Sequence, residues 1–237
     1  MKNKERRLFF ILLLTFVIGV LIGSQINNTY YPTNFFSERK INLAAVDMNG
    51  NGVAVPLKVE IKYGDGKVLT DIDKLLFWVD TQYSIQTARD VAENITGIDT
   101  SKYDIIYSID SNETGIVGGP SAGASLTIAT IAALSNKTIK TDVMMTGTIN
   151  EDGTIGPIGG VLEKAKAAKE IGAKIFIVPK GQGTEEKITP KENCDEILGF
   201  MYCQIIYEKE DIDVSQTSGI AVIEAETIQD AMKYFFE

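Results

Sequence analysis

The chain has 237 residues, of which 44% are hydrophobic and 23% charged, a composition typical of a packed globular protein. Its formal net charge is −9 at pH 7, and an acidic surface repels phosphate backbones, so nucleic acid is not expected as a partner. The chain contains no histidine, which excludes Ser-His-Asp triads, Cys-His dyads and most zinc sites. A nucleophilic mechanism would therefore need a different base, and lysine is the obvious candidate.

The N-terminal segment joins a basic tail, residues 1–7, to a run at 8–23 that is apolar except for Thr15. The run is slightly short for a membrane span of about 17–25 residues and slightly long for a signal-peptide core of about 7–15. A buried core helix is disfavoured because the run has no polar face. Since no clean cleavage site follows, we expect an uncleaved transmembrane anchor, with a secreted body if the segment is cleaved. The positive-inside tendency keeps residues 1–7 in the cytoplasm and places the body outside the cell membrane.

Beyond the anchor we expect a polar stalk at 24–39 and one domain over 40–237. In chain order, the patterns predict strands at 41–46 and 53–61, a helix at 83–95, a strand at 103–109, a helix at 121–134, a strand at 143–149, a helix at 162–171, strands at 175–178 and 202–207, and a helix at 227–236. Glycine-containing turns at 49–52, 64–66 and 151–153 separate several of them. This mixture predicts an α/β or α+β domain.

The chain contains two cysteines, Cys194 and Cys203, nine positions apart. They could form a disulfide in an oxidising compartment. The alternative is two unrelated buried thiols, because the sequence does not determine the separation of their Cα atoms. Both interpretations remain open from the sequence.

The first motif with chemical meaning is the octapeptide GGPSAGAS at 118–125, which places Ser121 in the first turn of a predicted helix. Its glycines allow a sharp turn and the close approach of a substrate. Backbone N–H groups at the start of a helix, with Gly119 and Ala122 as candidates, could stabilise a developing oxyanion. The plain alternative is a well-capped helix start with proline in its first turn.

The second motif is PIGGVLEK at 157–164, which places Lys164 in the first turn of the next predicted helix. A cation there is unfavourable to the helix dipole. Burial beside Val161 and Ala165 would lower the pKa of this lysine toward working pH, as a general base requires. The alternative is a surface lysine in a charged helix, because Lys166 and Lys169 follow.

Taken together, GGPSAG, then Met-Thr-Gly at 145–147, then PIGG and Glu-Lys resemble the proteolytic domain of Lon proteases over roughly residues 40–180. In that family the serine follows Gly-Pro and the base is the lysine 43 positions later, which here selects Ser121 and Lys164. The resemblance implies a Lon-type fold, a catalytic dyad of these two residues, and Thr146 as a hydrogen-bonding support for the lysine. It also accounts for an S-x-Q-x-A pattern at 84–88 in the helix before the serine.

The sequence departs from the family pattern at two places. Lon enzymes usually have an aspartate three residues before the serine, where this chain has Gly118; Asp110, Glu113 and Glu163 are unranked candidates to replace it. The G-x-x-x-x-G-K-[ST] motif of an ATPase does not occur in the sequence. The chain therefore looks like the small, membrane-anchored Lon-like proteins of archaea, with residues 180–237 extending past the well-matched region.

The resemblance implies an ATP-independent serine endopeptidase without metal or cofactor, acting on flexible or unfolded polypeptides. Homo-oligomers are possible, because Lon domains often assemble into rings. One alternative is an inactive scaffold or binding protein, for which Gly118 is the main argument. Another is a phosphate-binding domain, since a glycine-rich loop before a helix also binds anions; it leaves the spacing to Lys164 and Thr146 unexplained. Ser125, one helical turn after Ser121, is a substitute nucleophile or, more simply, a packing residue.

Overall fold

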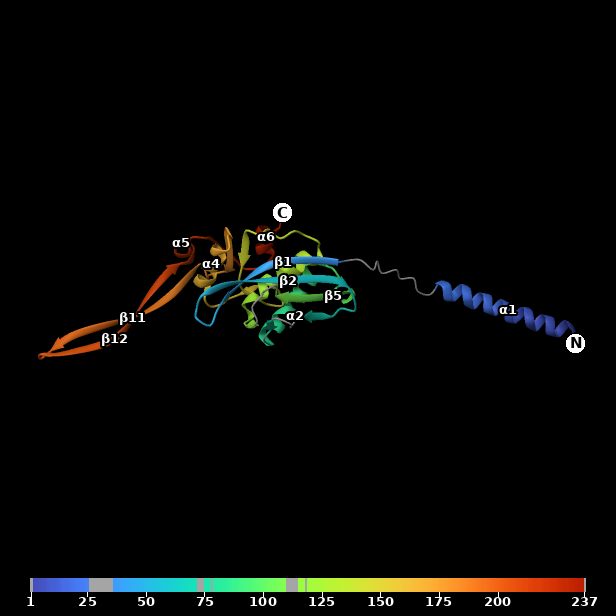
Figure 1. Cartoon of the computed structure of the whole chain (residues 1–237), viewed down its shortest axis with the longest axis horizontal. Coiled ribbons are helices and arrows are strands. Elements are labelled where there is room, and N and C mark those ends of the chain that lie inside the picture. Colours follow the sequence, from blue (N-terminus) through green and yellow to red (C-terminus); the bar gives the residue numbers. More distant parts are fainter. Residues whose placement is uncertain are drawn as a thin grey trace. The chain divides into compact units, whose positions relative to one another are not determined.

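Two units make up the computed structural model of the chain, Met1–Phe35 and Phe36–Glu237 (Figure 1). The structure describes residues 2–25, 36–71, 75–77, 79–109, 115–117 and 119–236.

The first unit contains one helix, α1 (Lys2–Gln25), which includes both the charged residues at 4–7 and the apolar run at 8–23. Its large apolar side chains between Leu8 and Val20 are exposed within the unit. Across the described part of the chain, no helix is both long enough and apolar enough to cross a membrane. The transmembrane anchor predicted from the sequence therefore gains no support from the structure.

A mixed seven-stranded sheet forms the centre of the second unit, in the order β13-β10-β7-β1-β2-β5-β3. Its strands are β1 (Phe36–Val46), β2 (Gly52–Tyr63), β3 (Val68–Thr70), β5 (Tyr103–Ile109), β7 (Val143–Met145), β10 (Ile175–Pro179) and β13 (Ala221–Ala225). Strand β2 runs antiparallel to β1 and β5, and the other neighbours are parallel. This architecture confirms the prediction of a mixed α/β fold.

The alternation of β2 explains how the sheet acquires a buried face. Leu57, Val59 and Ile61 are fully buried, whereas the residues between them are only partly covered. This is the expected result of a period of two on a sheet with one covered face. The turn into β2 is closed by Asp47, whose carboxylate accepts hydrogen bonds from the backbone N–H groups of Asn49 and Asn51 at 2.8 Å.

The helices of the second unit are α2 (Val79–Thr96), α3 (Gly123–Leu134), α4 (Val161–Glu170), α5 (Val214–Ser218) and α6 (Ile228–Phe235), with 3-10 turns η1 (Thr100–Lys102) and η2 (Pro120–Ala122). Every residue of α3 is buried, because the helix is alanine-rich, carries no charge, and packs against α2 as well as β1 and β2. Helix α4 packs against β1, β2 and α5. The sheet and these helices position the two motif-bearing segments.

Two predicted elements are interrupted where the motifs lie. The helix expected from residue 121 begins at Gly123, after the 3-10 turn η2. The strand expected at 143–149 ends at Met145, and residues 148–149 form β8 (Thr148–Ile149), which pairs with β9 (Ile155–Gly156). The strand breaks because the backbone N–H of Gly147 turns to donate to the carbonyl of Ser121 at 2.9 Å.

A long hairpin replaces most of the segment in which the sequence predicted one short strand at 202–207. Strands β11 (Thr184–Ile197) and β12 (Phe200–Asp213) pair antiparallel and project from the rest of the unit (Figure 1). Cys194 lies opposite Cys203 in this register, and the two form a disulfide with a Cα–Cα distance of 4.0 Å. A third two-stranded sheet pairs β4 (Leu75–Phe77) with β6 (Gly115–Val117).

Candidate active site

The structure brings Ser121 and Lys164 together from two separate elements, η2 and α4. The ammonium Nζ of Lys164 donates to Oγ of Ser121 at 3.1 Å across a sequence separation of 43 residues. Lys164 is buried, with 5% of its surface exposed, whereas Ser121 is half-buried. The serine therefore remains accessible to a substrate while its partner lies behind it.

The backbone around Ser121 is held from the side of α2. Gly119 has a φ of +95°, a conformation that favours glycine, and its carbonyl accepts from the hydroxyl of Thr81 at 3.3 Å. The carbonyl of Pro120 accepts from the hydroxyl of Ser84 at 3.5 Å. Two hydroxyls three positions apart on one face of α2 thus support the loop that carries the serine.

The same loop is held from the opposite side by the segment after β7. Both the backbone N–H of Gly147 and the hydroxyl of Thr146 donate to the carbonyl of Ser121, at 2.9 and 3.2 Å. Gly123 allows this approach, because a Cβ there would lie 2.5 Å from Cγ2 of Ile149. The serine is therefore fixed at its backbone before any substrate binds.

Thr146 thus occupies a different place from the one that the resemblance implied. Its hydroxyl donates to the backbone of Ser121, whereas the expected partner was Lys164. The reason is tertiary: Thr146 follows β7 directly, where its N–H bonds Ile177 of β10 and the chain turns toward η2. Thr146 supports the pair through the serine.

Lys164 is surrounded by apolar side chains at the start of α4. Val161, Leu162 and Ala165 are buried in the same helix and belong to a core cluster that includes Met144 and Phe176. This burial lowers the pKa of Lys164 from its ordinary value of 10.5 to about 8, while the negative charge of Glu185 opposes the shift. A lysine with that pKa can act as a general base near neutral pH.

The remaining sequence candidates fall into three groups. Gly119 and Ala122 lie on either side of the Pro120–Ser121 peptide, where backbone N–H groups can face an oxyanion. Ser125 is 1% exposed and donates to the carbonyl of Met145 at 2.9 Å, which favours the packing interpretation. Gly118, Asp110 and Glu113 lie outside the described residues.

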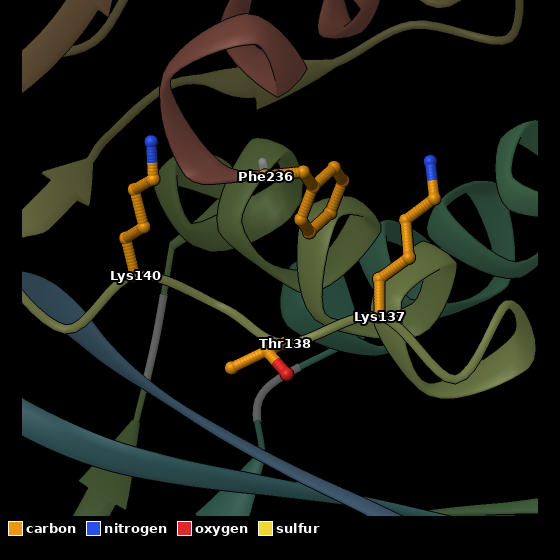
Figure 2. Close-up of a pocket in the computed structure, with 4 residues that line it drawn as sticks. All are labelled: Lys137, Thr138, Lys140 and Phe236. Carbon is orange, nitrogen blue, oxygen red and sulfur yellow. The ribbon is translucent and has the colours of Figure 1, made fainter.

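Two groups of side chains outside the pair have features of a ligand site. A pocket of about 290 Å³ is lined by Lys137, Thr138, Lys140 and Phe236, and Figure 2 shows the ring of Phe236 between the two lysines. It lies past the end of α3 opposite to Ser121, about 18 Å along the helix axis. Glu192 lies beside the two cysteines of β11 and β12, but the disulfide removes the thiolates that a metal would need.

Sequence reasoning missed three side chains that the structure places at the site: Thr81, Ser84 as a hydrogen-bond donor, and Glu185. The first two could have been found from their shared helical face, because the S-x-Q-x-A pattern already included Ser84. Glu185 gave no signal, because it lies 21 positions after Lys164 in a segment without predicted structure.

Comparison with known proteins gives a consistent result. The Lon protease (S16) C-terminal proteolytic domain matches residues 84–214, a range that includes Ser121, Thr146, Lys164 and Glu185. The archaeal Lon protease of Thermococcus kodakarensis is 36% identical over 125 residues, which cover 48% of this chain and 20% of that protein. The archaeal Lon protease of Pyrococcus abyssi is 33% identical over 158 residues, which cover 59% and 16%. The Lon protease 1 of Thermus thermophilus is 42% identical over 74 residues, which cover 31% and 9%.

The matches therefore cover only a small part of each relative. This chain spans a fifth or less of the length of these three proteins, 20%, 16% and 9%. The likeness concerns the proteolytic domain alone.

Proposed function

This chain belongs to the family of Lon (S16) C-terminal proteolytic domains, and we propose that it is a serine endopeptidase that works without ATP through Ser121 and Lys164. The observation that carries the proposal is the 3.1 Å contact between Nζ of the buried lysine and Oγ of the serine. The pair combines a nucleophile, Oγ of Ser121, with a base whose pKa lies near neutral pH. Covalent acyl transfer requires both.

The reaction follows from this geometry in two stages. Neutral Lys164 accepts the proton of Ser121 Oγ, which attacks the carbonyl carbon of a peptide bond. Backbone N–H groups around Gly119 and Ala122 stabilise the resulting oxyanion. The protonated lysine then donates its proton to the leaving amine, and a water molecule activated by neutral Lys164 hydrolyses the acyl-serine.

The lowered pKa of Lys164 makes the first step feasible. With a pKa of about 8, roughly a tenth of the molecules carry the neutral lysine at pH 7. With the ordinary value, the neutral fraction would be about a thousandth or less. We therefore expect kcat/KM for peptide cleavage to rise with pH through about 8, because the deprotonated lysine is the active form.

The substrate class follows from what the sequence contains and from the protease family. A proteolytic domain implies a polypeptide substrate. The sequence has no G-x-x-x-x-G-K-[ST] motif of an ATPase, which favours substrates that do not have to be unfolded first. Flexible segments and unfolded chains are the substrates that we propose.

The location is a separate proposal, which rests on the N-terminal segment. We propose that residues 8–23 hold the chain in the cell membrane with the peptidase domain outside the cytoplasm, because this run is uncharged and its described apolar side chains are exposed in α1. Membranes from cells that express the full chain should retain it during alkaline extraction, and external protease should digest its body. Release of the chain by alkali would contradict the anchor.

The test of the peptidase uses the full chain in a mild detergent, mixed with casein and no ATP, with cleavage followed by mass spectrometry. We expect Ser121→Ala and Lys164→Ala each to lower cleavage by about a thousandfold or more. Lys166→Ala, an exposed residue on the same helix, and Ser135→Ala, just after α3, are matched controls that should keep the parent rate.

The outcomes separate the possible functions. Cleavage lost in both dyad variants and kept in both controls supports the mechanism. Cleavage kept in Ser121→Ala and Lys164→Ala contradicts the dyad and leaves the activity to other residues. An inactive parent chain favours the scaffold or binding protein as the alternative.

A further inference from the structure

Glu185, at the root of the β11–β12 hairpin, makes direct contact with the helix that carries Lys164. Its Oε2 accepts a hydrogen bond from the backbone N–H of Leu162 at 3.0 Å. Leu162 is the second residue of α4, and Lys164 follows two positions later in the same turn. The carboxylate is half-buried and lies at the N-terminal end of the helix, where a negative charge is stabilising.

Helix α4 needs such a partner, because its own sequence supplies no cap. The N-cap residue is Gly160, in the left-handed conformation, and it makes no side-chain hydrogen bond to the first turn. A charge-assisted bond from a carboxylate to a helix N–H is among the stronger hydrogen bonds in proteins. Glu185 thus supplies from another strand what a serine or aspartate N-cap normally supplies locally.

The position of Glu185 is itself determined by neighbouring contacts. Gln182 makes two hydrogen bonds to the backbone of Ile158, accepting from its N–H at 2.9 Å and donating to its carbonyl at 2.7 Å. Val214, just after β12, donates to the carbonyl of Gly183 at 3.0 Å. Residues 182–185 therefore hold both the loop before α4 and the first turn of α4.

The charge of Glu185 also reaches the ammonium group of Lys164. Within the described residues, neither Glu163 on α4 nor the charged groups of β1 and β2 shift the pKa of Lys164, and β10 and α5, which also pack against that helix, carry no charged residue. Glu185 does so, and it raises that pKa against the lowering caused by burial. One carboxylate therefore acts on both the orientation and the protonation of this lysine.

We propose that Glu185 is the acidic positioning residue of the Ser121–Lys164 pair, holding the first turn of α4 and the lysine in line with the serine. It would supply the negative charge that the family pattern places three residues before the serine, where this chain has Gly118. The inference rests on the proposed function of the pair, but its main measurement does not require peptidase activity.

The experiment titrates Lys164 in the full chain in a mild detergent, by NMR of lysine side chains labelled with 13C at Cε. The Lys164 signal is identified by its loss in Lys164→Arg. Glu185→Gln keeps an oxygen that can accept from Leu162 but removes the charge. We expect the titration midpoint of Lys164 to fall by roughly 0.5–1 pH unit in this variant.

Glu186→Gln is the matched control. Glu186 is the next residue of β11, so its exposed side chain points to the other face of the hairpin, where it pairs with Lys209 at 2.8 Å. Glu186→Gln removes the same charge as Glu185→Gln, yet the titration midpoint of Lys164 should stay at the parent value. An unchanged midpoint in Glu185→Gln, or an equal shift in both variants, overturns the proposal.

Casein cleavage provides the second measurement. In Glu185→Gln the acidic limb of kcat/KM should move to lower pH together with the NMR midpoint, while kcat on the plateau stays within about threefold of the parent. In Glu185→Ala, which also loses the bond to Leu162, kcat should fall by about tenfold or more with little change in KM. A parent chain that cleaves nothing while Lys164 still responds to Glu185→Gln would contradict the peptidase alone.

Discussion

Helix α3 and the β11–β12 hairpin are stabilised in opposite ways. All residues of α3 are buried, whereas every described side chain of the hairpin from residue 186 to residue 211 is exposed. The first is held by apolar burial on all sides, and the second by its ladder of backbone hydrogen bonds and one disulfide. The comparison shows why a position beside α3 suits Ser121: a fully packed helix fixes the geometry that a surface ribbon cannot.

The contrast disappears at the root of the hairpin, which packs against the core of the second unit. Ile212 is half-buried against the core cluster that contains Phe176, and Glu185, its partner in the register, contacts α4. A two-stranded ribbon is marginally stable in water on its own. The hairpin is therefore anchored where it touches the site, and its outer part depends on the Cys194–Cys203 bond.

The strongest test of the comparison removes one phenylalanine from the packed core of the second unit and one from the hairpin. Phe176 is 0% exposed, so Phe176→Ala should lower the free energy of unfolding by about 3–5 kcal/mol through the cavity that it leaves. Phe200, in the hairpin, is 78% exposed, and Phe200→Ala should change the free energy of unfolding by less than about 0.5 kcal/mol. Urea unfolding followed by far-UV circular dichroism measures both, and equal losses would contradict the distinction.

The next test opens the disulfide. Replacing Cys194 and Cys203 together by serine should destabilise the hairpin by about 2–3 kcal/mol, because the bond closes a short loop in the unfolded ribbon. Limited proteolysis should then cut within residues 186–211 while the rest of the second unit stays intact. Loss of the whole unit at the same protease concentration would mean that the hairpin supports the body.

A third test concerns the buried charge in the body. Lys164 has a lower pKa in the folded chain than its ordinary 10.5, so the unfolded state binds the proton more tightly and stability rises with pH between about 8 and 10.5. Lys164→Met keeps the apolar stem without the charge and should be more stable than the parent by about 2 kcal/mol at pH 6. This advantage should shrink by pH 10. A constant difference across that range would show that the lysine is not buried as a charge.

The smallest effect is expected on the hairpin surface. Glu208 pairs with Lys191 at 2.7 Å, with both side chains more than half exposed, at 55% and 61%. Glu208→Gln should change the free energy of unfolding by less than about 0.5 kcal/mol, because exposed ion pairs contribute little. The measurement is urea unfolding at low and high salt, and a loss above 1 kcal/mol would show that this charge pair supports the ribbon.

The sequence pattern predicted an element correctly where the residues of that element alone determine its structure. The strand at 103–109 has the predicted bounds, and the predicted helix at 227–236 is found as Ile228–Phe235 with Thr227 as its N-cap. In both, the apolar residues that recur at strand or helix spacing are buried: Ile105, Tyr107 and Ile109 in the strand, and Ile228, Ala231 and Phe235 in the helix. The pairing of Ser121 with Lys164 came from motif spacing and the family resemblance, and the structure places the two side chains within hydrogen-bond distance.

Local pattern failed wherever a contact joins elements far apart in the chain. The hydroxyl of Thr146 donates to the carbonyl of Ser121, and the predicted strand at 143–149 ends at Met145 because the N–H of Gly147 donates to the same carbonyl. Strand β11 escaped detection because an exposed ribbon needs no apolar alternation.

The sequence by itself therefore determined the family, the α/β class and the two residues, Ser121 and Lys164, that we propose as nucleophile and base. Only the tertiary structure decided what holds that pair: the hydroxyls of Thr81 and Ser84, the backbone of Gly147, and the carboxylate of Glu185. The physical reason is that periodicity records which face of an element is buried. A hydrogen bond between elements depends instead on which segments the topology brings side by side.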